Sequence, residues 1–383
     1  METYKRYLDL KGLSKKKSFF LFGPRQTGKT FLLKQTFPSA KTYNLLLADQ
    51  FSTISRRPSI IREELLALKA SPVMPVIIDE IQKLPVLLDE VHNLIESHGF
   101  RFILTGSSAR KLKRSGANLL GGRAWTRHLF PLVSHEIPDF DLLRAINFGT
   151  LPHVYQSQFP SEELNAYCGT YLREEIQAEG AVRRIENFSR FLQVASLVNA
   201  ELLSFESVSR DAAVAARTVR DYFSILEDTL IGTMLHPFKR MIHRKAVSSV
   251  KFYLFDVGVA NQLAGRTNIA PKTELFGKSF EHLIFTELRA WLDYTSDGRP
   301  LTFWRDYNGH EVDFVIGDEV AIEVKSTESV TEKHLKSLKM FSDDIKIKRK
   351  IVVSLDSFPR TLGGVSIVPW REFLSRLWSG EFA

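Results

Sequence analysis

Short apolar runs alternate with helix-sized amphipathic stretches over the first third of the chain. The runs SFFLFG, TYNLLL, VIIDE and RFILTG are strand-sized, and the stretches 31–37, 60–68 and 86–96 lie between them. Strands separated by helices predict a parallel sheet in an α/β domain. We place this domain at residues 1–135.

The pattern changes twice further along the chain. From about residue 140 to 235, apolar residues recur at helical spacing, as at Phe188, Phe191 and Leu192. Beyond Lys251 the strand-sized runs return, as KFYLFD, LTFWRD, EVDFVI, VAIEVKS and RKIVVSLD. The sequence therefore predicts a helical region at 136–250 and a second α/β domain at 251–383.

Composition narrows the class of protein. The 383 residues are 44% hydrophobic and 25% charged, as in soluble globular proteins of two or three domains. We expect no membrane crossing, because no apolar run approaches the roughly 18 residues of a membrane span. The N-terminus also lacks the apolar stretch of a signal peptide. The single cysteine, Cys168, excludes an internal disulfide and suits a reducing cytoplasm, and the net charge of +8 makes polyanions candidate partners.

A phosphate-binding motif follows the first predicted strand. Residues 23–30 read GPRQTGKT and stand between the strand at 18–22 and the helical run at 31–37. This is the Walker A pattern in its strand-loop-helix context. The sequence therefore predicts a nucleotide site at this loop.

Each residue type in the loop has a physical role. Gly23 and Gly28 allow the backbone to wrap an anion at a helix N-terminus, whose dipole favours phosphate. Lys29 is expected to reach the β and γ phosphates of ATP, and Thr30 to place its hydroxyl on Mg²⁺. The other predicted nucleotide-binding residues of the loop are Pro24, Arg25, Gln26 and Thr27.

A Walker B arrangement follows about fifty residues later. The apolar strand in PVIIDEIQ, residues 75–82, ends in Asp79 and Glu80. Asp79 is expected to order the waters of the magnesium ion, and Glu80 to polarise the attacking water. Together the two motifs predict ATP hydrolysis rather than a chance glycine loop.

Two further basic features lie downstream. Arg123 stands in a Gly-Gly-Arg turn and is a candidate arginine finger, acting in cis or on the nucleotide of a neighbouring subunit. A structural surface arginine is the alternative. The basic cluster Arg110, Lys111, Lys113 and Arg114 is either a solvated loop or a polyanion contact.

Residues 204–236 resemble a winged helix-turn-helix. We expect helices at 206–213 and 217–227, with Val219, Phe223 and Leu226 facing inward. The second helix of such a motif enters the DNA major groove, although winged helices also serve as packing modules. The residues expected near its exposed face are Thr218, Arg220 and Asp221, and those of a basic wing are Lys239, Arg240, His243, Arg244 and Lys245.

A charged hairpin is predicted at residues 309–326, GHEVDFVIGDEVAIEVKS. A three-residue tip at 317–319 pairs Ile316 with Val320 and puts Asp313 opposite Glu323, with Lys325 on the same face as Glu323. The residues then expected together on the other face are Val312, Phe314, Ile316, Val320, Ile322 and Val324.

The polar face of this hairpin has two interpretations. Facing carboxylates suit phosphodiester hydrolysis, because oxygen ligands hold Mg²⁺ or Mn²⁺ and leave it several waters. Asp313 and Glu323 are then metal ligands, Glu281 on the stretch FGKSFEHLIFTELRAWL is a third, and Lys325 stabilises developing charge. An ordinary hairpin whose polar face meets water needs no metal.

The motifs together resemble the prokaryotic AAA-family ATPases that continue into a domain of unknown function with a PD-(D/E)xK nuclease-like end. The stretches that carry the resemblance are GPRQTGKT, VIIDEIQ, RFILTGSS, GGR, TVRDYFSILEDT, KFYLFDVG, FGKSFEH, GHEVDFVI and IEVKS. The resemblance implies a P-loop AAA-type ATPase domain, a winged-helix middle and a restriction-endonuclease-like α/β domain. It also implies ATP and Mg²⁺ as cofactors, and a polar sensor at Thr105 or Ser107.

We therefore expect a cytoplasmic, magnesium-dependent ATPase that acts on DNA, with ATP turnover coupled to remodelling and the C-terminal domain cutting or gripping nucleic acid. AAA-type sites often need an arginine from a neighbour, so we also expect a homo-oligomer such as a ring. Two alternatives remain. One is a nucleotide-gated switch with an inert nuclease-like module, and the other is a DNA-dependent motor without cleavage.

Overall fold

The computed structural model describes residues 3–68, 74–107, 110, 112, 120–171, 185–239 and 247–382. Its contacts divide the chain into two compact units. The N-terminal unit comprises Lys5–Phe130 and Asp228–Ile231, and the C-terminal unit comprises Met1–Tyr4, Pro131–Glu227 and Gly232–Ala383. Most of the predicted regions 136–250 and 251–383 thus lies in one unit, and the three-domain division stays a prediction.

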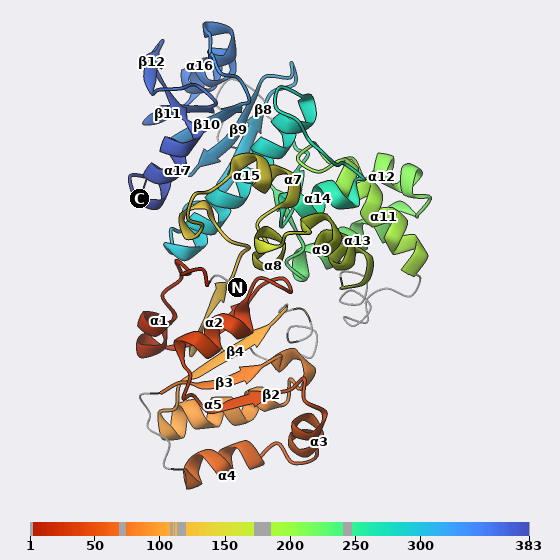
Figure 1. Ribbon diagram of the computed structural model, residues 1–383, viewed down its shortest axis with the longest axis vertical. Helices are drawn as coiled ribbons and strands as arrows, with labels where there is room; N and C mark the ends of the chain where they lie inside the picture. The colour runs from red at the N-terminus through yellow and green to blue at the C-terminus, as the bar shows by residue number, and fades with distance from the viewer. Residues whose placement is uncertain are drawn as a thin grey trace. The chain divides into compact units, whose positions relative to one another are not determined.

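A five-stranded parallel sheet forms the centre of the N-terminal unit, as predicted (Figure 1, red to orange). In the order β2-β3-β4-β1-β5, its strands are β2 (Thr42–Asn44), β3 (Val76–Asp79), β4 (Phe102–Gly106), β1 (Ser18–Phe22) and β5 (Ala124–His128). The helices of this unit are α1 (Leu10–Lys16), α2 (Lys29–Thr36), α3 (Ala48–Arg56), α4 (Ile60–Ala67), η1 (Ile81–Lys83) and α5 (Leu87–His98).

The central strands are apolar throughout because both of their faces are buried. Phe20, Ile78 and Leu104 belong to a core that also contains residues of α3, α4 and α5, while the alternate residues Leu21 and Ile103 are fully buried as well. Parallel strands all end at one edge of the sheet. The phosphate loop and the ends of β3 and β4 therefore meet at that edge, with β4 between β1 and β3.

Helices dominate the first part of the C-terminal unit. They are η2 (Ser134–Glu136), α7 (Leu142–Phe148), α8 (Pro152–Gln156), α9 (Pro160–Ala166), the π-helical turn η3 (Tyr167–Tyr171), α11 (Ile185–Leu197), α12 (Phe205–Ala212), α13 (Ala216–Asp228) and α14 (Val257–Leu263). Between α13 and α14, β6 (Gly232–Leu235) pairs antiparallel with β7 (Lys251–Leu254).

The helix pair α12 and α13 lies within one residue of its predicted bounds. Val219, Phe223 and Leu226 are buried, as predicted. The ring of Phe223 lies 4.8 Å from Phe191 of α11 and 4.8 Å from Phe252 of β7, so α13 packs between a helix and the two-stranded sheet. Most of the predicted basic residues, namely Arg240, His243, Arg244, Lys245, Lys111, Lys113 and Arg114, lie outside the described residues.

A six-stranded mixed sheet completes the C-terminal unit (Figure 1, blue). In the order β12-β13-β11-β10-β9-β8, its strands are β12 (Arg360–Leu362), β13 (Val365–Pro369), β11 (Arg349–Ser354), β10 (Val320–Lys325), β9 (Glu311–Ile316) and β8 (Leu301–Arg305). Its helices are α15 (Glu274–Tyr294), η4 (Glu332–Leu335), α16 (Lys336–Asp344) and α17 (Trp370–Trp378). No helix in the described parts of the chain is both long enough and apolar enough to span a bilayer.

The hairpin of β9 and β10 has the predicted three-residue tip, because Ile316 pairs with Val320. The ladder ends at the pair Phe314 and Ile322, one pair before the predicted opposition of Asp313 and Glu323. Asp313 instead accepts a hydrogen bond from the N–H of Val324 through its side chain, at 2.7 Å. The carboxylate of Asp313 therefore still lies beside β10.

A β-bulge in β9 changes which side chains share a face. Thr302 and Trp304 of β8 pair with Val315 and Val312, so β9 has one more residue than β8 in this interval. Val312 and Val315 consequently pack in the same core cluster with α16, whereas Phe314 packs against Phe285 of α15. The prediction that Val312 and Phe314 share a face was wrong, because the extra residue shifts the alternation by one.

Candidate functional site

The loop at residues 23–28 joins the buried end of β1 to the first turn of α2. Gly28 caps α2 with φ at +94°, a conformation that glycine adopts without strain. A Cβ atom at Gly23 would lie 2.4 Å from the carbonyl oxygen of Leu129, so a side chain is excluded there. The N-terminus of α2 presents its N–H groups and the positive end of its dipole to this loop. A phosphate group fits this arrangement.

Lys29 and Thr27 hold the loop from inside. The Nζ atom of the buried Lys29 donates to the carbonyl oxygens of Gly23 at 2.6 Å and Pro24 at 2.9 Å. Thr27 is fully buried and its hydroxyl donates to the oxygen of Pro24 at 2.9 Å, so only its backbone is left to contact a phosphate. Arg25 and Gln26 are half-buried. The lysine predicted to bind phosphate thus lies within the loop.

Arg6 supports the same loop from the start of the N-terminal unit. Its Nη1 donates to the carbonyl oxygen of Thr27 at 2.7 Å, and its Nη2 donates to that of Phe130 at 2.6 Å. Phe130 is the last residue before the chain leaves the N-terminal unit. One guanidinium therefore links the phosphate loop to a point where the chain crosses between units.

Asp79 is the centre of a hydrogen-bond network at the strand ends. Its Oδ2 accepts from the hydroxyl of Thr30 at 3.0 Å, and its Oδ1 accepts from the hydroxyl of Thr105. The oxygen of Thr105 in turn accepts from the N–H of Glu80 at 3.2 Å. The first turn of α2 and the ends of β3 and β4 are thereby joined. The Thr30 hydroxyl and the Asp79 carboxylate lie close enough together for both to bind one Mg²⁺ ion, directly or through its waters.

Glu80 lies directly beside this network. Its φ of +63° is uncommon for a residue with a side chain. Its Oε2 accepts from Nε2 of Gln82, and the same nitrogen lies 3.4 Å from the hydroxyl of Ser107. The two candidate sensors are thus separated by their contacts: Thr105 bonds to Asp79, while Ser107 bonds to Gln82, which holds Glu80.

Arg123 is far from this edge of the sheet. The parallel register pairs Ala124 with Ser18, the first residue of β1, whereas the phosphate loop follows the last residue. One strand length, about 15 Å, therefore separates Arg123 from the loop of the same chain. Its side chain forms an ion pair with Glu96 of α5. A finger role in cis is wrong on this topology, and the role in trans stays a prediction.

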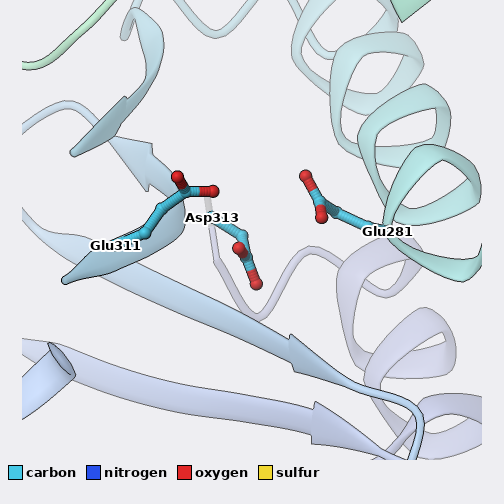
Figure 2. Close-up of side chains that lie close together, drawn as sticks. All are labelled: Glu281, Glu311 and Asp313. Atoms are coloured by element: carbon cyan, nitrogen blue, oxygen red, sulfur yellow. The ribbon is translucent and has the colours of Figure 1, made fainter. Parts of the chain in front are cut away.

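A second group of charged residues lies in the C-terminal unit. Glu281 of α15 and the pair Glu311 and Asp313 of β9 point their carboxylates toward one another (Figure 2). One ligand oxygen from each residue lies within 4.8 Å of the other two, close enough to hold one metal ion. Glu323 lies nearby on β10, where its Oε1 is 2.5 Å from Nζ of Lys325.

Two carboxylates of the hairpin's polar face are shielded from water, whereas the side chain of Lys325 on the same face is 32% exposed. Asp313 is 6% exposed and Glu323 is 4% exposed, so the interpretation as a solvated face was wrong. The Oε2 atom of Glu323 is buried and has no hydrogen-bond partner among the described residues. A buried carboxylate oxygen without a partner costs free energy, and a cation would remove that cost.

The electrostatics of this group follow from burial. Burial raises the pKa of Asp313 well above its usual value, and the charges of Glu323 and Glu281 raise it further. Burial also raises the pKa of Glu323 to about 7. For Lys325 burial lowers the pKa, but the carboxylates of Asp313 and Glu323 outweigh that effect and raise it above its usual value. A divalent cation here would favour the ionised carboxylates.

Lys251 of β7 contacts these carboxylates, and sequence reasoning gave it no role. Its Nζ lies 3.0 Å from Oε1 of Glu281 and also forms an ion pair with Glu311. The hydroxyl of Tyr253, two residues on, donates to the same Oε1 of Glu281 at 2.6 Å. The strand β7 thereby fixes the carboxylate of Glu281.

The exposed side of α13 carries charges of both signs. Arg217, Arg220 and Asp221 are exposed, and Thr218 is half-buried. The Nη2 atom of Arg220 donates to Oε1 of Glu206 on α12 at 3.0 Å, and its guanidinium lies over the ring of Phe205. The described part of this helix pair is therefore not a uniformly basic surface.

Comparison with known proteins found three family models that match successive parts of the chain. Residues 15–138 match the family model described as an AAA domain. The AAA-type domain is followed by matches to two domains of unknown function, DUF8612 at residues 139–270 and DUF4143 at residues 276–373. Neither description assigns an activity to the carboxylate group.

Two more distant similarities were found. An uncharacterized protein of Methanocaldococcus jannaschii is 23% identical over 375 residues, covering 85% of this chain and 80% of the relative. A solved signal transduction ATPase with numerous domains and a tetratricopeptide repeat sensor, from Pyrococcus horikoshii, is 14% identical with a TM-score of 0.24. That match covers 75% of this chain and 47% of the solved chain, and at this TM-score it does not establish a shared fold.

Four residues beside the sites of the AAA-type domain and the C-terminal unit were given no role by sequence reasoning. Arg6 precedes the Walker A motif by 17 residues, and no local pattern marks it. Gln82 lies two residues after Glu80 in the stretch PVIIDEIQ, which was its only signal. Lys251 opens an otherwise apolar strand, and Glu311 alternates with Asp313 in the hairpin. A lysine in a buried strand is unusual enough to have suggested a buried anion nearby.

Proposed function

We propose that this protein binds Mg²⁺-ATP at the loop of its AAA-type domain and hydrolyses it. The observation that carries the proposal is the network around Asp79, in which Thr30 of the phosphate loop and Thr105 of β4 both donate to one carboxylate. This network brings the predicted magnesium ligands into direct contact at the edge of the sheet where the loop lies.

The roles follow from the positions. The N–H groups at the start of α2 and the ammonium of Lys29 bind the phosphates, and Thr30 and Asp79 hold the magnesium ion with its waters. Glu80 takes the proton of the attacking water, and Gln82 orients its carboxylate. Thr105 links Asp79 to the backbone of Glu80 and so sets the distance between metal and base.

The first test is phosphate release from ATP. Lys29→Ala should abolish turnover, because the β and γ phosphates lose the ammonium group that is proposed to bind them. Lys34→Ala is the matched control, since Lys34 is an exposed lysine on the same helix and should leave turnover unchanged. Undiminished turnover in Lys29→Ala would refute the assignment.

We also propose a second activity, metal-dependent phosphodiester cleavage, at the carboxylate group of the C-terminal unit. The observations that favour it are the convergence of Glu281 and Asp313 and the buried, unpartnered Oε2 of Glu323 within the described part of the chain. In this proposal Asp313, Glu323 and Glu281 hold Mg²⁺ or Mn²⁺, and Lys325 stabilises the charge that develops on the phosphate.

Action on DNA is part of this proposal. It is tested by incubating plasmid and branched DNA with Mn²⁺ or Mg²⁺, where Asp313→Asn or Lys325→Ala should stop cutting. Asp318→Asn, at the exposed tip of the same hairpin, is the control and should cut normally. Absence of cutting with every metal, together with DNA-stimulated ATP turnover, would favour a DNA-dependent motor.

The remaining alternative is a nucleotide-gated switch in which the C-terminal unit is an inert interaction module. The ion pairs of Lys251 with Glu281 and Glu311 favour it, because they already neutralise two of the carboxylates. If DNA neither binds nor changes ATP turnover, the switch is the correct reading. The AAA-type site also leads us to propose a homo-oligomer in which Arg123 serves the nucleotide of a neighbour.

A further inference from the structure

The ammonium of Lys251 is enclosed among carboxylates. Its side chain is 3% exposed, and it lies between Glu281 of α15 and Glu311 of β9. Taking an ammonium out of water is costly unless carboxylates compensate it, and here two of them do. Lys251 is therefore a permanent positive charge at this place in the fold.

Some carboxylate oxygens of this group already have a cation or hydrogen-bond donor as partner, and others have none among the described residues. Both oxygens of Glu311 are used, since Oε1 contacts Lys251 and Oε2 accepts from Nη1 of Arg305 at 2.9 Å. Glu281 receives both of its donors, Lys251 and Tyr253, on Oε1. Glu311 is thus held by two cations and is the poorest ligand of the group, while Oε2 of Glu281 accepts no hydrogen bond from the described residues.

Two further oxygens are available on the other side of the group. Asp313 accepts from Val324 through Oδ2, and among the described residues this leaves Oδ1 for a ligand. The Oε2 atom of Glu323 is buried without a partner in the described residues, although Lys325 pairs with its Oε1. Glu281, Asp313 and Glu323 therefore each retain one oxygen within the described part of the chain, and hard cations take such oxygen ligands while keeping some of their waters.

The charges of the group agree with a single ion. With all four carboxylates ionised, as a bound divalent cation favours, Glu281, Glu311, Asp313 and Glu323 exceed the three cationic groups of Lys251, Lys325 and Arg305 by one negative charge. One divalent cation reverses that excess to one positive charge, which a phosphodiester, a monoanion, balances. Two divalent cations would leave an excess that a phosphodiester does not balance.

We propose that Lys251 takes the place of a second metal ion, so that this site holds one divalent cation together with one phosphodiester. The proposal rests on the metal-dependent cleavage proposed above. It assigns to Lys251 the role that a second ion plays in two-metal phosphodiesterases, namely a fixed positive charge opposite the first ion.

The test counts bound Mn²⁺ per chain by electron paramagnetic resonance and by titration calorimetry, at pH 7.5 without nucleotide. Every chain carries Asp79→Asn, so that the phosphate loop contributes no ion. The otherwise unchanged protein should bind one ion, and Lys251→Met should bind two, because Glu281 and Glu311 then lose their cation. Lys278→Met is the matched control, since Lys278 lies on the same helix as Glu281 but pairs with Glu201 and Glu274.

The outcomes separate this inference from the function on which it rests. Two ions in the protein that retains Lys251 would overturn the inference and leave metal-dependent cleavage standing, whereas no ion would overturn both. One ion in both the parent and Lys251→Met would also overturn the inference. If Lys251→Met does not fold, as judged by circular dichroism, the count for the parent still decides, and Lys251→Arg should bind one ion.

Discussion

The two candidate sites of this protein are built in opposite ways. In the AAA-type domain, a short loop and three strand ends bring together neutral hydroxyls, backbone groups and one lysine around Asp79. In the C-terminal unit, acidic and basic side chains from α15, β7, β9 and β10 form ion pairs with one another in largely buried surroundings. In the first arrangement, Lys29 and Asp79 form hydrogen bonds with neutral groups. In the second, most of the charged groups already form ion pairs with one another.

This difference has an energetic consequence. A site made of backbone N–H groups and hydroxyls needs little compensation before a phosphate binds, because these groups are neutral. A cluster of buried charges is stable only while every charge keeps its partner, and removal of one partner costs several kcal/mol. Substitutions should therefore affect catalysis in the first site and both stability and metal binding in the second.

The largest effect is expected at Glu80. Glu80→Gln should retain ATP binding but lower the rate of hydrolysis by at least about 100-fold, because a general base contributes about that much or more. Phosphate release and binding of a fluorescent ATP analogue measure the two properties separately. The control is Asp89→Asn, an exposed acid in the first turn of α5. A change of less than about threefold in hydrolysis would remove Glu80 from the mechanism.

A smaller effect is expected at Thr105. It tests how much a neutral hydroxyl contributes to the site in the AAA-type domain. Thr105→Val keeps the shape but removes the hydroxyl that donates to Asp79 and accepts from Glu80. The loss of about 1.4 kcal/mol should lower kcat about tenfold with little change in KM. Thr105→Ser should restore kcat. Equal losses in the Val and Ser variants would show that the methyl group, not the hydroxyl, matters.

The smallest effect concerns pH and the buried acids of the C-terminal unit. Burial raises the pKa of Asp256 to about 6 and that of Glu287 to about 7, so the folded state holds protons that the unfolded state releases above about pH 4. The free energy of unfolding contributed by these groups therefore falls as pH rises from about 4 to 7. Burial lowers the pKa of His282 to about 4 and also lowers the pKa of His334, and these two histidines act in the opposite direction.

The melting temperature of metal-free protein should consequently fall by a few degrees between pH 5 and pH 7.5, as followed by circular dichroism. Asp256→Asn should reduce that fall, because the substituted side chain does not titrate. A melting temperature that rises steadily over this range would show that the two acids do not carry the shifted pKa values.

The sequence placed the phosphate loop after β1 and Asp79 at the end of β3 because this information is local, while the roles of these residues stay predictions. Gly23 to Thr30 and Asp79-Glu80 are short motifs whose meaning depends only on the strand before them, and parallel strands bring their ends together automatically. The hairpin tip was predicted for the same reason, since its register follows from three residues.

The site in the C-terminal unit was predicted only in part because its contacts join distant segments. Lys251 reaches Glu281 and Glu311 over 30 and 60 residues of chain, and no spacing rule connects them. The bulge in β9 was also missed, because a bulge depends on how β8 pairs with its neighbour. It reversed the expected face of Phe314 but kept Asp313 next to Glu281. The middle helices were found by periodicity, which says nothing about what their exposed face binds.

The hydrogen bonds of Arg6 show that the N-terminal unit begins before the residues that match the AAA domain model. The family match begins at residue 15, nine residues after the arginine that holds the carbonyl oxygens of Thr27 and Phe130. A domain produced separately from residues 15–138 would contain both Walker motifs and yet leave those two oxygens without their donor. The phosphate loop of such a fragment should be less rigid than in the whole chain. A fragment intended to report the native activity should therefore start before Arg6.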